Sequence, residues 1–196
     1  MLKLILVRHG TTFANESGQY IGQSESPLSP KGQQEAIRLC KQLERIAIDK
    51  MYVSPSLRVL ETVSYLNKKQ VEIEVVAALR EIDFGCYEGK DFNWLQKNTP
   101  QEVEAMLAQG EAYTYPKGES LEMLYQRVRD WLRDWLKCSE EGTFLIVAHG
   151  GTIRCILSEL LCHTNALHWH FKIEPATLTQ VSIEEGFAVL EGLNEK

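Results

Sequence analysis

The sequence lacks any apolar run near the roughly 20 residues that a membrane-spanning helix needs. Its N-terminus offers only six mostly apolar residues before Arg8, too few for the hydrophobic part of a secretion signal. It also lacks a basic excess, because 21 Lys and Arg stand against 27 Asp and Glu, for a net charge of -6. These shortages argue against a membrane partner and a nucleic-acid partner, and they predict a cytoplasmic protein.

Recognisable cysteine motifs are missing as well. The five cysteines form an odd, scattered set without a C-x-x-C motif: Cys40, Cys86, Cys138, Cys155 and Cys162. Such a set predicts reduced thiols that serve as small apolar side chains, not a disulfide framework. His163, His168 and His170 lie close together after Cys162, but their spacing matches no zinc pattern, so we expect no metal site.

What the sequence does contain is an alternation of short apolar runs with helical patterns. The expected strands are 2–7, 51–53, 71–76 and 143–148, with a closing hairpin over 177–183 and 187–190. The expected helices are 30–46, one after Ser54-Pro55, 121–135 and 153–161. This order predicts a single α/β domain over 1–196, with a doubly wound, mostly parallel sheet and helices on both faces.

Two of these helices begin with the same signal. Ser29-Pro30 and Ser54-Pro55 each combine an N-cap residue with a proline at the first helical position. The second helix is expected to bury Leu57, Leu60 and Val63, together with Leu66.

Residues 80–118 are less regular. Glycines and prolines break this stretch into turns and short helices, and we expect it to be an insertion that covers the substrate. Its aromatic residues Tyr87, Trp94 and Tyr113 either line a substrate pocket or pack the insertion itself.

Two of the expected buried strands end in a His-Gly pair. Arg8-His9-Gly10 follows the first strand, and His149-Gly150 follows the strand over 143–148. In open α/β sheets, ligands bind in the crevice beyond the carboxyl ends of the strands. The sequence therefore predicts that Arg8 and the two histidines belong to one site.

A resemblance to a known family covers nearly the whole chain. Leu-Val-Arg-His-Gly-Thr-Thr-Phe-Ala-Asn over 6–15 resembles the signature of the histidine phosphatase superfamily, the phosphoglycerate-mutase-like proteins. Further blocks follow in the family's order at 20–29, 54–62, 79–89, 118–120 and 148–154. The block over 54–62 is similar to the one that carries the family's second arginine, and the block over 79–89 looks like its acid-bearing loop.

The resemblance implies that His9 accepts a phosphoryl group as a phosphohistidine, which water then hydrolyses. Arg8 and Arg58 would bind phosphate oxygens through their forked donors, and a protonated His149 would donate a third hydrogen bond. The other ring nitrogen of His9 would be held by a backbone carbonyl such as that of Gly10. The residues expected to bind substrate are Arg8, Gly10, Asn15, Ile21, Gly22, Arg58, His149 and Gly150.

Three carboxylates in one segment compete for the role of general acid. Spacing alone leaves Glu81, Asp83 and Glu88 open. The resemblance favours Glu81, which would protonate the leaving oxygen and then accept a proton from the attacking water. Arg154, five residues after His149, is expected to face solvent or to pair with an acid on its own helix.

The resemblance leaves several activities open. Phosphoglycerate mutases of this superfamily carry a longer insertion with paired arginines, whereas residues 90–118 contain no arginine, which favours a hydrolase. The segments 168–173 and 175–177 are similar to the α-ribazole phosphatases of cobalamin nucleotide-loop assembly. We therefore predict α-ribazole 5'-phosphate as the substrate, with a broad-specificity or phosphoserine phosphatase as the alternative. A phosphoglycerate mutase or a non-catalytic phosphate-binding module fits less well.

Neither a cofactor nor a metal is implied, because two arginines and a histidine can balance the charge of a phosphomonoester, about -2 near pH 7. The expected partner is a small-molecule phosphomonoester, bound by a monomer or a homodimer.

Overall fold

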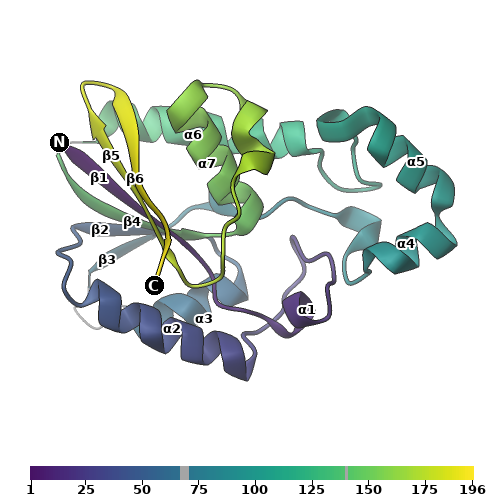
Figure 1. The fold of residues 1–196 in the computed structure, drawn as a ribbon, viewed down its shortest axis with the longest axis horizontal. Helices are drawn as coiled ribbons and strands as arrows, with labels where there is room; N and C mark the ends of the chain where they lie inside the picture. The colour runs from purple at the N-terminus through teal and green to yellow at the C-terminus, as the bar shows by residue number, and fades with distance from the viewer. Residues whose placement is uncertain (67–70, 140) are drawn as a thin grey trace.

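The structure, a computed structural model, describes residues 1–66, 71–139 and 141–196. Its six-stranded sheet has the order β3-β2-β4-β1-β5-β6 (Figure 1). The strands are β1 (Leu2–Arg8), β2 (Lys50–Val53), β3 (Glu72–Val75), β4 (Gly142–Ala148), β5 (Leu178–Glu184) and β6 (Phe187–Glu195). The first four are parallel to one another, and the hairpin of β5 and β6 adds two antiparallel strands beside β1. The predicted mostly parallel α/β fold is confirmed.

Helices cover both faces of the sheet, also as predicted. In Figure 1, α2 (Pro30–Leu43) and α3 (Leu57–Leu66) lie below the sheet, and α6 (Leu121–Cys138) and α7 (Gly150–Cys162) lie above it. Along β1, Leu4 and Leu6 pack into the core under α6 and α7, whereas Ile5 and Val7 pack into the core over α2 and α3. A central parallel strand buried on both faces explains why 2–7 is nearly all apolar.

Helix α2 begins where the sequence predicts, with the Ser29 hydroxyl accepting a hydrogen bond from the amide of Gly32 at 3.3 Å. Helix α3 corrects the second prediction, because it begins at Leu57 and not at Pro55. The predicted buried face is half right: Val63 and Leu66 are buried, but Leu57 is 39% exposed and Leu60 41% exposed. The helix also buries Arg58, Val59 and Thr62.

The stretch over 80–118 consists of turns and short helices, as expected. It contains η2 (Gly85–Tyr87), α4 (Phe92–Asn98), α5 (Pro100–Gln109) and η3 (Gly110–Ala112), after η1 (Ala77–Leu79). Helices α4 and α5 lie at the end of the molecule farthest from the hairpin (Figure 1). Tyr87, Leu95 and Val103 give this region a small core of its own, against Tyr20 and Tyr115.

The remaining elements are two short helices. Helix α1 (Phe13–Glu16) forms a single turn inside the segment 11–28, which the sequence predicts to be a loop. The 3-10 helix η4 (Asn165–His170) follows α7 and carries two of the three clustered histidines. All five cysteines are free thiols.

Membrane-spanning helices and metal-binding groups are both absent from residues 1–66, 71–139 and 141–196. No helix in this part of the chain is long and apolar enough to cross a membrane. No group of three or more His, Cys, Asp and Glu side chains that could hold a metal ion occurs within the same residues.

Candidate active site

The carboxyl ends of β1 and β4 bring the two His-Gly pairs together. The strands are parallel and in register, with Arg8 opposite Ala148, and the amide of His9 donates to the carbonyl of Ala148 at 3.0 Å. The rings of His9 and His149 consequently lie edge to face, with centroids 5.2 Å apart.

His9 is buried, and its ring is held at one nitrogen. Nδ1 lies 2.8 Å from the carbonyl oxygen of Gly10. A carbonyl can only accept, so Nδ1 carries the hydrogen and Nε2 keeps a lone pair. Burial, followed by the positive charges of Arg58 and Arg8, lowers the pKa of His9 well below its usual value. The ring is therefore neutral near pH 7.

Arg58 is fully buried and joins several parts of the site. Its Nε donates to Nδ1 of His149 at 3.2 Å, Nη1 donates to the carbonyl of Ser24 at 3.1 Å, and Nη2 donates to that of Gly22 at 2.8 Å. Nε2 of His149 in turn lies 2.8 Å from the Ser54 hydroxyl.

These contacts determine the protonation state of His149. Nδ1 accepts from Arg58, so the ring hydrogen sits on Nε2 and is donated to Ser54. Burial, with Arg58 as the next cause, lowers the pKa of His149 well below its usual value. His149 is therefore neutral in this structure, and its role as a protonated donor beside a bound dianion stays a prediction.

Arg8 has a donor that lacks a partner. Its Nη1 donates to the carbonyl of Ile173 at 2.8 Å, but its buried Nε has no hydrogen-bond partner in the part of the chain that the structure describes. Gly150 leaves room beside it, since a Cβ there would lie 3.6 Å from Nε. A buried and unsatisfied cationic donor favours an anion as its ligand.

Glu81 lies against the turn between β4 and α7. Its Oε2 accepts from the amide of Gly151 at 2.9 Å, and Oε1 accepts from its neighbour Ile82 at 3.1 Å. A Cβ on Gly151 would lie 2.5 Å from Oε1 of Glu81, so glycine is required for this close approach.

The other two candidate carboxylates are engaged elsewhere. Glu88 accepts from the backbone amides of Gly22, Gln23, Ser24 and Phe84, at 3.0 to 3.2 Å. Asp83 accepts from the amide of Gly85 at 2.7 Å. Glu88 thus ties two loops together, whereas Glu81 contacts Gly151, two residues after His149, and its charge acts on Arg8 and Arg58.

The loop residues expected to bind phosphate are partly committed to the protein itself. Oδ1 of Asn15 accepts from the amide of Thr12, which caps α1. The amide of Gly22 donates to Glu88 and its carbonyl accepts from Arg58, while Ile21 is half-buried beside it. The amide of Gly10 donates to the Thr62 hydroxyl at 3.1 Å. The amides of Gly22, Gln23 and Ser24 thus donate to Glu88 in this structure, and a role for this loop in phosphate binding stays a prediction.

A cavity of about 690 Å³ adjoins Glu81 and Gly151. We call it the aromatic cavity; its ring-bearing walls are Tyr20, Phe84, Tyr113, Tyr115, His168 and Trp169. Of the three aromatic residues that the sequence singles out, Tyr113 lines this cavity, Tyr87 is in the small core, and Trp94 is exposed.

Sequence reasoning missed Arg154. It does not pair with an acid on its own helix, but donates from Nε to the carbonyl of Phe171 at 2.9 Å. Its guanidinium lies 5.5 Å from the centre of the Trp169 ring, and it lines the aromatic cavity. No signal in the local spacing of α7 could have revealed this, because Trp169 lies in η4 and Phe171 directly follows it.

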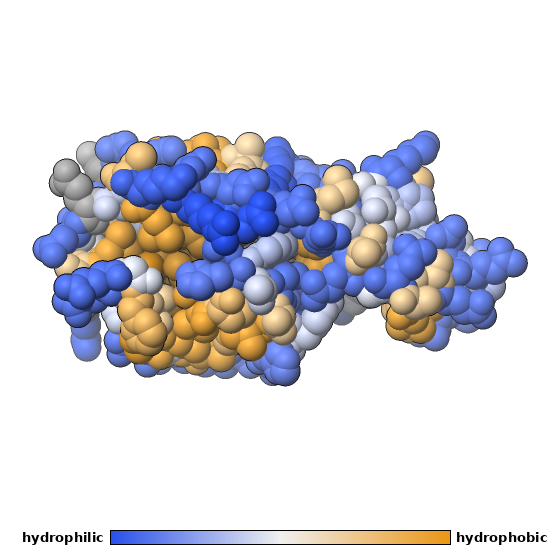
Figure 2. Space-filling model, turned by 90° about the horizontal axis from the view of Figure 1, so that it is seen from above, coloured by the Kyte–Doolittle hydropathy of each residue, from blue (hydrophilic) through white to orange (hydrophobic). Residues whose placement is uncertain are grey.

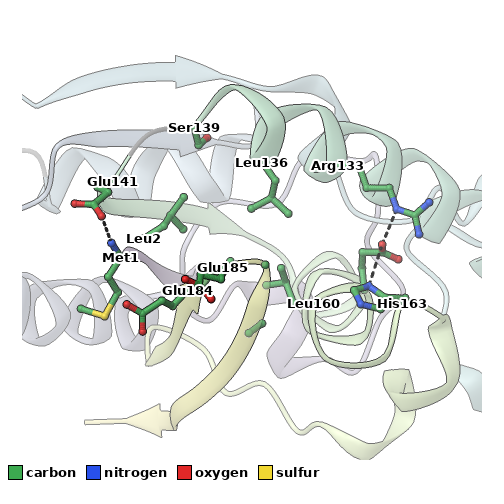
Figure 3. Close-up of a pocket in the computed structure, with 14 residues that line it drawn as sticks. Met1, Leu2, Arg133, Leu136, Ser139, Glu141, Leu160, His163, Glu184 and Glu185 are labelled. Atoms are coloured by element: carbon green, nitrogen blue, oxygen red, sulfur yellow. Dashed lines mark hydrogen bonds and ion pairs between the residues drawn. The ribbon is translucent and has the colours of Figure 1, made fainter.

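A further cavity, of about 710 Å³, lies away from both histidines, between α6, α7 and the hairpin (Figure 3). Figure 3 shows Glu141 paired with the N-terminus at one end and Arg133 near His163 at the other. No residue of the candidate site lines it.

The family model for the histidine phosphatase superfamily, branch 1, matches residues 4–196. The chain belongs to this superfamily. Its resemblance to the α-ribazole phosphatases extends to whole chains: the adenosylcobalamin/alpha-ribazole phosphatase of Salmonella typhimurium is 29% identical, over 100% of this chain and 97% of that protein. Phosphoserine phosphatase 1 of Hydrogenobacter thermophilus is also 29% identical, over 99% of this chain and 92% of that protein.

A solved structure is also similar to this histidine phosphatase over nearly the whole chain. The alpha-ribazole phosphatase from Shigella flexneri superposes with a TM-score of 0.93 at 26% identity, covering 99% of this chain and 96% of the other. The similar proteins differ in the substrate that they are named for, so family membership identifies a phosphatase without identifying its leaving group.

Proposed function

We propose that this phosphatase acts through a phosphohistidine at His9 and that its substrate is α-ribazole 5'-phosphate. In the first half-reaction, Nε2 of His9 attacks phosphorus, the bond from phosphorus to the ester oxygen breaks, and Glu81 gives that oxygen its proton. In the second, Glu81 takes a proton from water as the water attacks phosphorus. The phosphorus–nitrogen bond then breaks, which restores His9 and releases inorganic phosphate.

The cations around His9 support this chemistry, because phosphoryl transfer calls mainly for positioning and charge stabilisation. Nε of Arg8 is buried without a partner, and Arg58 would exchange its contacts with the Gly22 and Ser24 carbonyls for phosphate oxygens. The charge of a bound dianion would raise the pKa of His149 from its lowered value and favour a donor role for that ring.

The aromatic cavity carries the choice of substrate. It begins at Glu81, where the ester oxygen would sit, and continues between ring-bearing side chains, of which Phe84, Tyr113 and Tyr115 come from the stretch over 80–118. Such walls suit a flat heteroaromatic leaving group, as in a benzimidazole riboside, better than a small charged one. The insertion thus covers the substrate as part of the same domain.

Arg154 favours phosphoserine as the second candidate. Its guanidinium lies in the wall of the aromatic cavity and offers a carboxylate a forked partner. Glu111, in the same wall, could hold an amino group.

Phosphate release from a panel of esters tests the proposal. We would use α-ribazole 5'-phosphate, phosphoserine, 3-phosphoglycerate and an aryl phosphate, each with EDTA present and with His9→Ala as the control. The largest kcat/KM is expected for α-ribazole 5'-phosphate, undiminished by EDTA. A preference for phosphoserine would favour the second candidate, similar slow rates would indicate a broad phosphatase, and no turnover at all would leave a phosphate-binding module.

A further inference from the structure

Another cavity, of about 890 Å³ and distinct from the two described above, adjoins Arg8. It lies between α2 and the segment over 172–177 that leads into β5. In Figure 1 this region lies beside the C-terminus of the chain, below the sheet. We call it the basic groove. Besides Arg8 and Arg154, its walls carry five further cationic side chains: Lys31, Arg38, Lys41, Lys172 and Lys196.

Its two carboxylates balance little of this charge. Glu35 accepts from the amide of Thr11 at 2.8 Å and is 4.0 Å from Lys31. Glu174 is shared by Lys172 at 3.1 Å and Lys196 at 2.7 Å. The groove is therefore positive in a chain whose net charge is -6.

Two cations on α2 contribute without a counter-ion. Arg38 and Lys41 line the groove, and neither forms an ion pair with any described residue. On α6, by contrast, Lys137 pairs with Asp134 at 2.8 Å. The arrangement on α2 instead leaves their charge available to a ligand.

The inner end of the groove, at Arg8, is also positively charged. Arg8 and Arg154 both line the groove there. Burial is the main cause that lowers the pKa of Arg8, the charge of Glu81 raises it, and the charge of Arg154 lowers it further. Two guanidinium groups that repel each other are stabilised when an anion binds between them. A ligand of the groove would therefore reach the edge of the catalytic site.

We propose that the basic groove is a second anion site, which binds a phosphate-type dianion next to the catalytic site and shares Arg8 with it. The chemistry it recognises is a compact group with several oxygen acceptors and two charges. Free inorganic phosphate and the phosphoryl group of an ester both present that chemistry. The groove's charge and size carry this inference, so it stands whether or not the protein hydrolyses α-ribazole 5'-phosphate.

Equilibrium binding of inorganic phosphate tests the second site without requiring turnover. Isothermal titration of the native chain is expected to give two equivalents of phosphate. Arg38→Glu with Lys41→Glu is expected to leave one, because the charge reversal repels the groove's anion while the ligands around His9 are intact. The matched control is Arg129→Glu with Lys137→Glu on α6, which makes the same change of charge away from the groove and should keep two.

Three results would overturn the second site: one equivalent in the native chain, two in the groove variant, or an equal loss in both variants. Repeating the titration with benzylphosphonate, which resists hydrolysis, distinguishes the two sources of the dianion. Two equivalents of benzylphosphonate would mean that the groove accepts a phosphoryl group that carries an organic substituent. One equivalent would mean that the groove accepts only free phosphate. A protein that binds two phosphates but hydrolyses no ester would refute the proposed function and leave this site standing.

Discussion

A histidine that attacks phosphorus must be neutral at one ring nitrogen and held at the other, and both conditions come from groups next to His9. The Gly10 carbonyl holds Nδ1, and burial near Arg58 and Arg8 keeps the ring neutral. The same two arginines that would bind phosphate therefore also prepare its nucleophile. Their positive charge lowers the pKa of the ring before substrate arrives, and it offsets the charge of the phosphoryl group afterwards.

The first prediction concerns His9 itself. His9→Ala should lower kcat by on the order of 10⁴-fold or more, because no other described side chain is placed to form the covalent intermediate. Phosphate release measures the loss, and acid-labile labelling of the protein by a radioactive substrate should disappear with it. Titration with inorganic phosphate provides the control, since the arginines remain. A variant that kept a tenth of the native kcat would rule out His9 as the nucleophile.

The second prediction separates two carboxylates. Glu81→Gln should lower kcat by about 10²–10⁴-fold for esters with poor leaving groups, and by less for an aryl phosphate, whose oxygen leaves without a proton. Glu88→Gln should instead cost about 1–3 kcal/mol in the free energy of unfolding, because it turns an amide donor toward backbone N–H groups. The two measurements are kcat on both ester types and urea unfolding.

If Glu81→Gln left turnover intact while Glu88→Gln abolished it in a folded protein, Glu88 and not Glu81 would be the general acid.

The turn from β4 into α7 shows how one element positions the acid. Gly151 lies so close to Glu81 that any side chain there would displace the carboxylate, whereas Gly150 faces Arg8 across an ordinary contact distance. Gly150 and Gly151 are adjacent in one helical turn, but the first faces Arg8 and the second faces Glu81.

Our third prediction uses that difference. Gly151→Ala should lower kcat by about 10²-fold, the usual effect of moving a catalytic group by about 1 Å. Gly150→Ala should keep most of the native activity, since its Cβ would lie 3.6 Å from Nε of Arg8. Steady-state kinetics on one ester compares them, with thermal unfolding to confirm that both variants fold. Equal losses of kcat in the two variants would show that crowding of Glu81 by residue 151 does not cause the loss.

Helix α3 shows why some of the site could not be predicted from the sequence. Apolar spacing locates strands and helices because burial of apolar surface drives folding, and it located α2, α6 and the central strands correctly. On α3 the buried face carries the polar side chains of Arg58 and Thr62, so the apolar pattern misses these two and includes the exposed Leu57 and Leu60. Ser54 looks like a helix cap, but its hydroxyl binds His149, which lies 95 residues away in sequence.

At the scale of the whole molecule, the separation of the two ends of the sheet explains which parts were predictable. The carboxyl ends of β1 and β4 gather the site, and motif and fold both point there. The contacts of Arg154 and the walls of the aromatic cavity depend on how η3, η4 and α7 meet, which local patterns do not contain. Figure 2 shows apolar side chains gathered on the face seen from above, toward the end of the molecule away from α4 and α5.

The last prediction concerns the pH dependence of the whole fold. His9, His149 and His168 are buried with lowered pKa values, and burial brings that of His168 to about 4. Below the usual histidine pKa of about 6.5, the unfolded chain binds protons that the folded chain excludes, so the free energy of unfolding falls as the pH falls. For His168 this loss runs from about pH 6.5 to about 4 and amounts to about 3 kcal/mol.

Urea unfolding between pH 7 and pH 5 measures the slope. His168→Gln should flatten it, even though loss of the contact with Cys155 lowers stability at pH 7. The control is His170→Gln, because that side chain is exposed in the folded protein and its removal should leave the slope as it is. A native slope that His168→Gln does not change would mean that this ring takes up its proton without unfolding, and that η4 opens locally in acid.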